Sequence, residues 1–255
     1  PYRSTSDTSA WVDYAGINAM RVWAAANDYV STSEGPTYGD GVTSQSLFDA
    51  DRDAVRANPE SNPFLDITAI NWSKTQTGRN NINLDYVLGQ LQQVGVDVLL
   101  QTTRSTAYNY VGSGADGNIW GGRWEQWKWY YTIAYYAAKN YDVQRYQMYN
   151  EPDLAGIRQS EWLDRMKVAA DAIHAAIADV NARYSKSLSP DVYAPVAAST
   201  TGSLDTWGKT ALTTNRTDFE GNPSSYDLFN VYDVHRYNST GPTFANDQTL
   251  FDAKI

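Results

Sequence analysis

Short apolar runs and amphipathic segments alternate along the chain, and this alternation predicts strands separated by helices. The predicted strands cover 18–23, 96–103, 143–150, 192–199 and 226–237. The predicted helices cover 9–15, 124–139, 203–213 and the beginning of another at 244–255. Two further helices are predicted with their caps: Asn83 caps a helix that buries Leu84, Leu88 and Leu91 on one face and ends at Gly95, and Ser160 caps a long helix that continues to about Ile177. Because strands that alternate with amphipathic helices form βαβ units, we expect an α/β fold with a parallel sheet.

The number of predicted strands indicates an incomplete barrel. A (β/α)8 or TIM barrel has eight strands in about 250 residues, whereas this chain of 255 residues has five, each with a helix before it. We therefore expect residues 1–255 to form a single barrel domain that is truncated at both ends and contains strands two to six. Strand one is expected before Pro1, and strands seven and eight after Ile255. The alternative architecture is an open five-stranded sheet.

Two long polar stretches interrupt the alternation, at 26–80 and 104–122. Connections of this length are usually functional, and here they are expected to build a cleft at the mouth of the barrel. Within the first stretch, Asp49, Asp51 and Asp53 are spaced like calcium ligands. Ala54 occupies the position where a calcium-binding loop needs glycine. We therefore interpret the three aspartates as acidic residues at the start of a helix.

Composition narrows the classes of function. A net charge of −9 argues against a nucleic-acid partner, which a basic surface would bind. No stretch approaches the roughly 20 apolar residues of a membrane span, and the absence of cysteine excludes thiol catalysis and thiolate metal sites. The chain has nine tryptophans and nineteen tyrosines, and we expect most of these side chains in the core. A few near the predicted loops indicate sugar binding, because the flat faces of sugars stack on aromatic rings.

The main candidate for chemistry is Glu151, in the sequence Tyr149-Asn150-Glu151-Pro152-Asp153. It follows a predicted strand, and active sites of parallel barrels gather at the carboxyl ends of strands. Pro152 disfavours a helical conformation at Glu151. An exposed turn is the alternative for this motif taken alone.

Polar side chains at two other predicted strands strengthen this interpretation. Period-two alternation places Asp233, His235 and Tyr237 on one face of the last strand. Arg21 shares a face with Trp23 on the first strand, where it needs a carboxylate or hydrogen-bond partner if it points inward. The alternative for Arg21 is a position on the helix-facing side that reaches solvent.

With Arg21, Asn150-Glu151-Pro152 and His235-x-Tyr237, the sequence resembles the clan A glycoside hydrolases, and within them the β-agarase and β-porphyranase type. The resemblance implies that Glu151 is the general acid/base and that Asn150 bonds the 2-hydroxyl of the sugar. It also implies that Arg21 supports the nucleophile side of the site.

For the last predicted strand, the resemblance implies that Tyr237 orients the nucleophile, beside His235 in the wall of the site. The nucleophile of this group is a glutamate at the end of strand seven, which we expect beyond Ile255.

The expected function is therefore retaining hydrolysis of a β-linked polysaccharide, with endo action and an agar or porphyran galactan as substrate. Trp23, Trp120 and Trp124 are expected to bind the sugar. No cofactor or metal is expected, and the protein is expected to be secreted or periplasmic. The alternatives are a non-catalytic carbohydrate-binding barrel, a xylosidase-like or mannanase-like clan A enzyme, and a metal-dependent hydrolase, which would need more histidines than His235 at the site.

Overall fold

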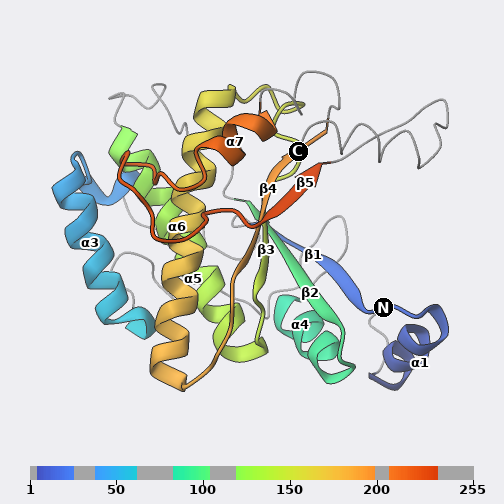
Figure 1. The fold of residues 1–255 in the computed structure, drawn as a ribbon. Coiled ribbons are helices and arrows are strands. Elements are labelled where there is room, and N and C mark those ends of the chain that lie inside the picture. The colour runs from blue at the N-terminus through green and yellow to red at the C-terminus, as the bar shows by residue number, and fades with distance from the viewer. Residues whose placement is uncertain (1–4, 26–37, 62–82, 104–118, 199–206, 235–255) are drawn as a thin grey trace, which may run out of the picture.

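The computed structural model describes residues 5–25, 38–61, 83–103, 119–198 and 207–234. Within these ranges, five strands form one parallel sheet in the order in which they occur along the chain (Figure 1). The strands are β1 (Ala19–Ala25), β2 (Asp97–Thr103), β3 (Arg145–Met148), β4 (Asp191–Ala197) and β5 (Val231–Val234). The predicted α/β fold with a parallel sheet is confirmed, and in the described part of the chain the sheet is open.

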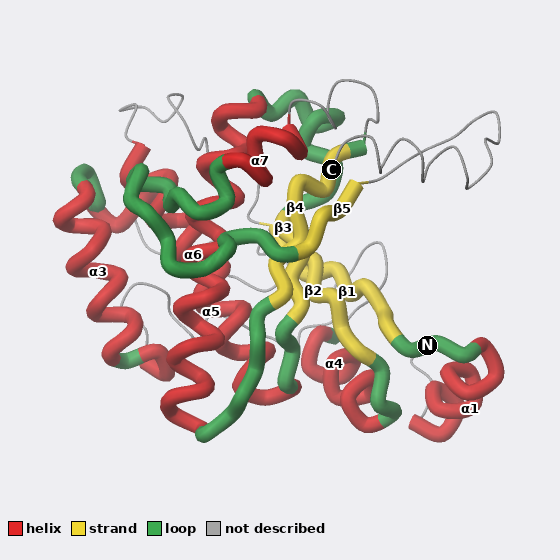
Figure 2. Tube along the Cα trace, viewed as in Figure 1, coloured by secondary structure: helices red, strands yellow, loops and turns green. Residues whose placement is uncertain are grey.

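The helices precede or connect these strands. They are α1 (Thr5–Ala15), α3 (Gln45–Ala57), α4 (Leu84–Gln93), α5 (Ile119–Tyr141), α6 (Gln159–Tyr184) and the short α7 (Lys209–Thr213), with 3-10 turns at Tyr38–Gly41 and Pro59–Ser61. Figure 2 shows α3, α5 and α6 together on one side of the sheet, and α5 packs along α6. No helix in the described ranges is both long enough and apolar enough to cross a membrane.

One of the two predicted helix caps is confirmed. Asn83 Oδ1 accepts a hydrogen bond from the backbone N–H of Tyr86 at 3.0 Å, and α4 buries its three leucines as expected. The prediction for Ser160 was wrong, because α6 begins at Gln159 and Ser160 lies inside its first turn. Arg158 occupies the cap position without a side-chain hydrogen bond, and the backbone N–H of Trp162 reaches its carbonyl at 2.9 Å.

The stretch 26–80 is not a continuous loop, because α3 lies within it. Ser44 caps this helix by accepting from the backbone N–H of Leu47 at 3.4 Å. The three spaced aspartates, Asp49, Asp51 and Asp53, all lie on this helix, and Asp49 pairs with Arg52 at 2.8 Å. The acidic run is therefore part of a helical surface and not a calcium-binding loop.

The two faces of the sheet differ in polarity, as period-two alternation requires. On the helix side, Trp129 of α5 donates to Thr102 Oγ1 at 3.0 Å, and Tyr146 donates its hydroxyl to the carbonyl of Ala134 at 3.2 Å. The other face carries apolar side chains such as Leu99 and Val231, but also most of the polar and aromatic ones. The polar and aromatic side chains are Arg21 and Trp23 of β1, Gln101 of β2, Arg145 and Gln147 of β3, Tyr193 of β4 and Asp233 of β5.

A ladder of stacked rings forms the centre of the core on α5. Trp124, Trp127, Tyr131 and Tyr135 stack in turn, with ring centroids 5.9, 4.8 and 5.9 Å apart. Each ring also has a carboxylate partner for its polar atom: the partners are Asp40, Asp171, Asp179 and Glu60, at 2.8–3.0 Å. The ladder thus buries large apolar areas without leaving indole or phenol groups unsatisfied.

Candidate functional site

Glu151 lies at the carboxyl edge of the sheet, three residues after β3 ends at Met148. Its side chain is partly exposed, and so is that of Asn150. The predicted strand reached Asn150, whereas the observed strand ends two residues earlier and the chain bends at Tyr149 and Asn150. This bend directs the chain from β3 across to the end of β4.

Two hydrogen bonds fix the turn that contains Glu151 to β4. The backbone N–H of Glu151 donates to the carbonyl of Val196 at 3.0 Å. Asp153 Oδ1 accepts from the backbone N–H of Ala198 at 2.9 Å. The turn closes on itself where the N–H of Leu154 donates to the carbonyl of Glu151 at 3.1 Å. The backbone of Glu151 is therefore held between two neighbouring strand ends.

The backbone at this edge is strained. Tyr149, Glu151 and Val196 have φ angles of +67°, +50° and +59°, in the left-handed region that non-glycine residues rarely adopt. The conformation is most unfavourable for Val196, which is branched at Cβ. Such residues cost roughly 1–3 kcal/mol each and gather at functional sites, where the surroundings hold them in place.

Buried side chains hold the bend at Tyr149 and Asn150 in place. Gln101 is completely buried, and its Nε2 donates to the carbonyl of Tyr149 at 2.5 Å. The N–H of Tyr149 continues the sheet by donating to the carbonyl of Thr102 at 3.0 Å. The ring of Tyr149 lies 5.7 Å from that of Trp162, whose indole N–H donates to the carbonyl of Pro195 at 3.1 Å. Strands β2, β3 and β4 and helix α6 thus all restrain the residues before Glu151.

Substituting Gln101 by leucine tests this support. The change preserves side-chain size but leaves the carbonyl of Tyr149 without its buried donor, which costs about 1–3 kcal/mol. We expect hydrogen exchange across 149–155 to become about tenfold faster or more. Thr102→Val is the matched control, because it removes the bond to Trp129 on the opposite face of the same strand. Faster exchange of 149–155 in both variants, to the same extent, would contradict a specific role for Gln101.

A chain of polar contacts crosses the face of the sheet that carries Arg21. Arg21 Nη1 donates to Gln147 Oε1 at 3.4 Å, and Gln147 in turn donates through Nε2 to Asp233. Arg21 and Trp23 share this face, since the residues between and after them, Val22 and Ala24, are buried on the other side.

The sequence analysis did not identify Gln147 or Gln101 as site residues. The sequence did contain a sign of their role: Gln101 and Gln147 lie at paired positions of β2 and β3, and a glutamine is unusual in an otherwise apolar strand.

The predicted sugar-binding tryptophans lie in different surroundings. Trp23 is 38% exposed at the face of the sheet, and Trp120 is partly buried, 5.9 Å from Phe48 and 4.7 Å below the guanidinium of Arg123. Trp124 is completely buried in the ring ladder, so its placement does not fit contact with a sugar. His235 and Tyr237 lie outside the described residues.

Two cavities of the described structure lie away from Glu151. One has a volume of about 730 Å³ and is lined by α3, α6 and the segments that precede β4 and β5. Another, of about 190 Å³, lies at the amino ends of β2 and β3. Among the described residues, no group of three or more histidines and carboxylates is arranged to hold a metal ion.

Fold and site together define a parallel α/β protein with a restrained carboxylate at the carboxyl edge of its sheet. No protein family model matches the chain, and no curated protein matches it in sequence. A solved structure described as "Structural insights into a family 39 glycoside hydrolase from the gut symbiont Bacteroides cellulosilyticus WH2" is similar, with 13% sequence identity and a TM-score of 0.44. The similarity covers 85% of this chain and 34% of that one, so this chain spans about a third of the length of that protein.

Proposed function

We propose that this chain belongs to a retaining glycoside hydrolase with a (β/α)8 barrel, in which Glu151 is the general acid/base. The observation that carries the proposal is the position of Glu151 at the carboxyl edge of β3, where its N–H is bonded to Val196 of β4. Strained, well-restrained backbone at that edge is typical of a catalytic carboxylate in a parallel barrel.

The chemistry follows from two carboxyl groups about 5–5.5 Å apart. Glu151 protonates the leaving oxygen while a second carboxylate attacks the anomeric carbon. Glu151 then deprotonates the water that releases the glycosyl intermediate. In this proposal the nucleophile is a glutamate at the end of the seventh strand of the barrel.

The remaining roles complete the proposal. Tyr237 and His235 border the nucleophile, Asn150 bonds the 2-hydroxyl of the sugar, and Arg21 supports the charge of the nucleophile side. The contact of Arg21 with Gln147, which is bonded to Asp233, supports this arrangement, because it holds a cation and a carboxylate in one network across the sheet face.

The proposed substrate is a β-linked galactan of the agar or porphyran type, cleaved within the chain by a secreted or periplasmic enzyme. Trp23 supports a sugar ligand, because it is a large aromatic side chain left partly exposed beside Arg21 on the polar face of the sheet. Trp120 is the second proposed contact, at the start of α5.

Product stereochemistry tests the proposal. The full-length protein is incubated with agarose, porphyran, xylan or mannan oligosaccharides, and the anomeric protons are followed by NMR from the first minutes. We expect the β-anomer to form first on one of these substrates and then to mutarotate, because double displacement retains configuration. Initial formation of the α-anomer would contradict a retaining mechanism, and sugar binding without any hydrolysis would favour the non-catalytic barrel.

A further inference from the structure

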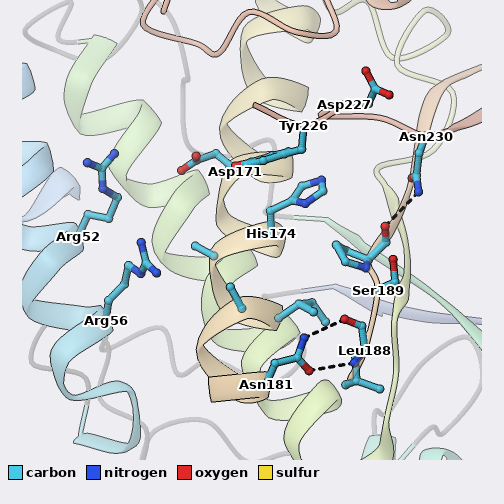
Figure 3. A pocket seen from close by; sticks show the side chains of 14 residues that line it. Arg52, Arg56, Asp171, His174, Asn181, Leu188, Ser189, Tyr226, Asp227 and Asn230 are labelled. Atoms are coloured by element: carbon cyan, nitrogen blue, oxygen red, sulfur yellow. Dashed lines mark hydrogen bonds between the residues drawn. The ribbon is translucent and has the colours of Figure 1, made fainter. Parts of the chain in front are cut away.

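The cavity of about 730 Å³, which Figure 3 shows from close by, lies at the amino ends of β4 and β5, whereas Glu151 lies at the carboxyl edge of the sheet. Its walls come from α3, α6 and the residues immediately before β4 and β5. Glu151 lies beside the far end of β4, and the seven residues of that strand span roughly 20 Å. The cavity is therefore separate from the proposed catalytic site, and its volume falls in the range of about 300–1,000 Å³ that is usual for ligand pockets.

An aromatic pair forms part of the wall. The rings of His174 and Tyr226 stack with centroids 4.2 Å apart at an angle of 30°, and Tyr226 remains 38% exposed. His174 Nε2 is buried and has no hydrogen-bond partner in the described part of the chain. Figure 3 shows Asp171 next to this pair, and Asp171 and His174 both come from α6. The wall therefore offers an aromatic side chain with exposed surface, Tyr226, stacked on an imidazole whose Nε2 a ligand does not reach.

The charges around the cavity are already paired. Arg56 makes a bidentate contact with Asp179 at 2.9 and 2.8 Å, and Arg52 pairs with Asp49 at 2.8 Å. Asp227 pairs with Arg216 at 2.8 Å. Burial raises the pKa of Asp171, which favours its neutral form. A neutral ligand with many hydroxyl groups fits this wall better than a strongly charged one.

We propose that this cavity is a second carbohydrate-binding site, which holds a neutral sugar unit against Tyr226 and His174. The exposed part of the Tyr226 ring provides a flat surface for the C–H face of a sugar. Polar side chains that line the cavity, among them Arg52, Arg56 and Asp227, can bond the hydroxyl groups of the sugar. The choice of a sugar as the ligand rests on the proposed function, whereas the cavity and its aromatic pair do not.

The small number of histidines makes a direct experiment possible. This chain has two, His174 and His235, and in the full-length protein the His174 signal is assigned as the imidazole signal that disappears in His174→Gln. The full-length protein carrying Glu151→Gln, which prevents turnover in the proposed mechanism, is titrated with a hexasaccharide from agarose and, separately, with xylohexaose and inorganic sulfate. We expect at least one hexasaccharide to shift the His174 signal saturably and sulfate to leave it unchanged.

Variants of the stacked tyrosine provide the second part of the test. Tyr226→Ala is expected to weaken binding at His174 by about tenfold or more, whereas Tyr226→Phe keeps the ring and should bind within about threefold of the unmodified residue. Circular dichroism and the His174 signal of the free protein establish that each variant is folded. If Tyr226→Ala does not fold, Tyr226→Leu, which removes the flat ring but keeps apolar bulk, takes its place.

The outcomes separate this inference from the proposed function. A His174 signal that is unmoved by either hexasaccharide up to about 10 mM would overturn the inference, even if the active protein hydrolyses those sugars. A shift caused by sulfate would also overturn it, because the cavity would then bind anions. A saturable, Tyr226-dependent shift supports the inference, even if the protein hydrolyses none of the sugars.

Discussion

Replacement of Glu151 by glutamine is expected to slow hydrolysis of oligosaccharides by about 10²–10⁴-fold, the usual contribution of a general acid/base. Glutamine keeps the size of the side chain but cannot protonate the leaving oxygen. Aryl glycosides with strongly acidic leaving groups need little protonation, so their first step should remain fast. The release of the intermediate should then limit turnover, and azide, which needs no general base to attack, should accelerate it and yield a β-glycosyl azide.

Kinetics with matched substrates measures this effect. The full-length enzyme and its variant are compared on an oligosaccharide and on a dinitrophenyl glycoside of the same sugar. Glu220→Gln is the control, because Glu220 is a carboxylate in the loop before β5 whose Oε2 bonds Gln45 and Asn222, far along the chain from the proposed site. An equal loss on both substrates, without rescue by azide, would assign Glu151 a structural role.

Replacement of Trp127 by alanine is expected to lower the free energy of unfolding by about 3–5 kcal/mol, which is typical for a large buried aromatic residue. Trp127 has no exposed surface and lies in the middle of the ring ladder, between Trp124 and Tyr131. Its removal leaves a cavity and also deprives Asp171 of an indole N–H donor at 2.8 Å. Because two separate contributions are lost at one position, this should be among the most destabilising single changes in the described core.

Denaturant unfolding with two further variants separates these contributions. Trp127→Phe keeps a ring in the ladder but removes the bond to Asp171, so it should cost about 1–3 kcal/mol. Tyr14→Ala changes a side chain that is 86% exposed on α1 and should change stability by less than about 0.5 kcal/mol. A loss in Trp127→Ala no larger than in Tyr14→Ala would mean that α5 does not hold the core in the way described.

Strong local patterns in the sequence were sufficient to predict most of the fold. Short apolar runs predicted all five strands, and the leucines after Asn83 predicted α4 and its buried face. Helix α3 was missed because its buried face in the structure consists of Phe48 and Val55, seven residues apart, among charged side chains. The cap of α6 was misplaced because serine favours cap positions in general, whereas here the chain already turns into the helix at Gln159.

The site was only partly predictable, for a physical reason. The position of Glu151 followed from its place at a strand end, which is a property of the local sequence. The support for it is not local: Gln101 lies 48 positions from the carbonyl that it bonds, and Asp153 bonds an N–H 45 positions away. Trp124 illustrates the same limit in reverse. Its position near a predicted loop suggested contact with a sugar. Trp124 lies instead on the face of α5 that points into the core.

If Glu151 acts as proposed, the left-handed residues at the edge of the sheet oppose thermal stability to catalytic activity. A glycine at position 196 would relieve the torsional strain at no steric cost, so selection for thermal tolerance alone would favour it. The same glycine would widen the range of orientations of the carbonyl that receives the N–H of Glu151. Efforts to make this protein more heat-resistant should therefore leave this edge unchanged and seek gains on exposed helix surfaces, where preorganisation of the carboxylate is not at stake.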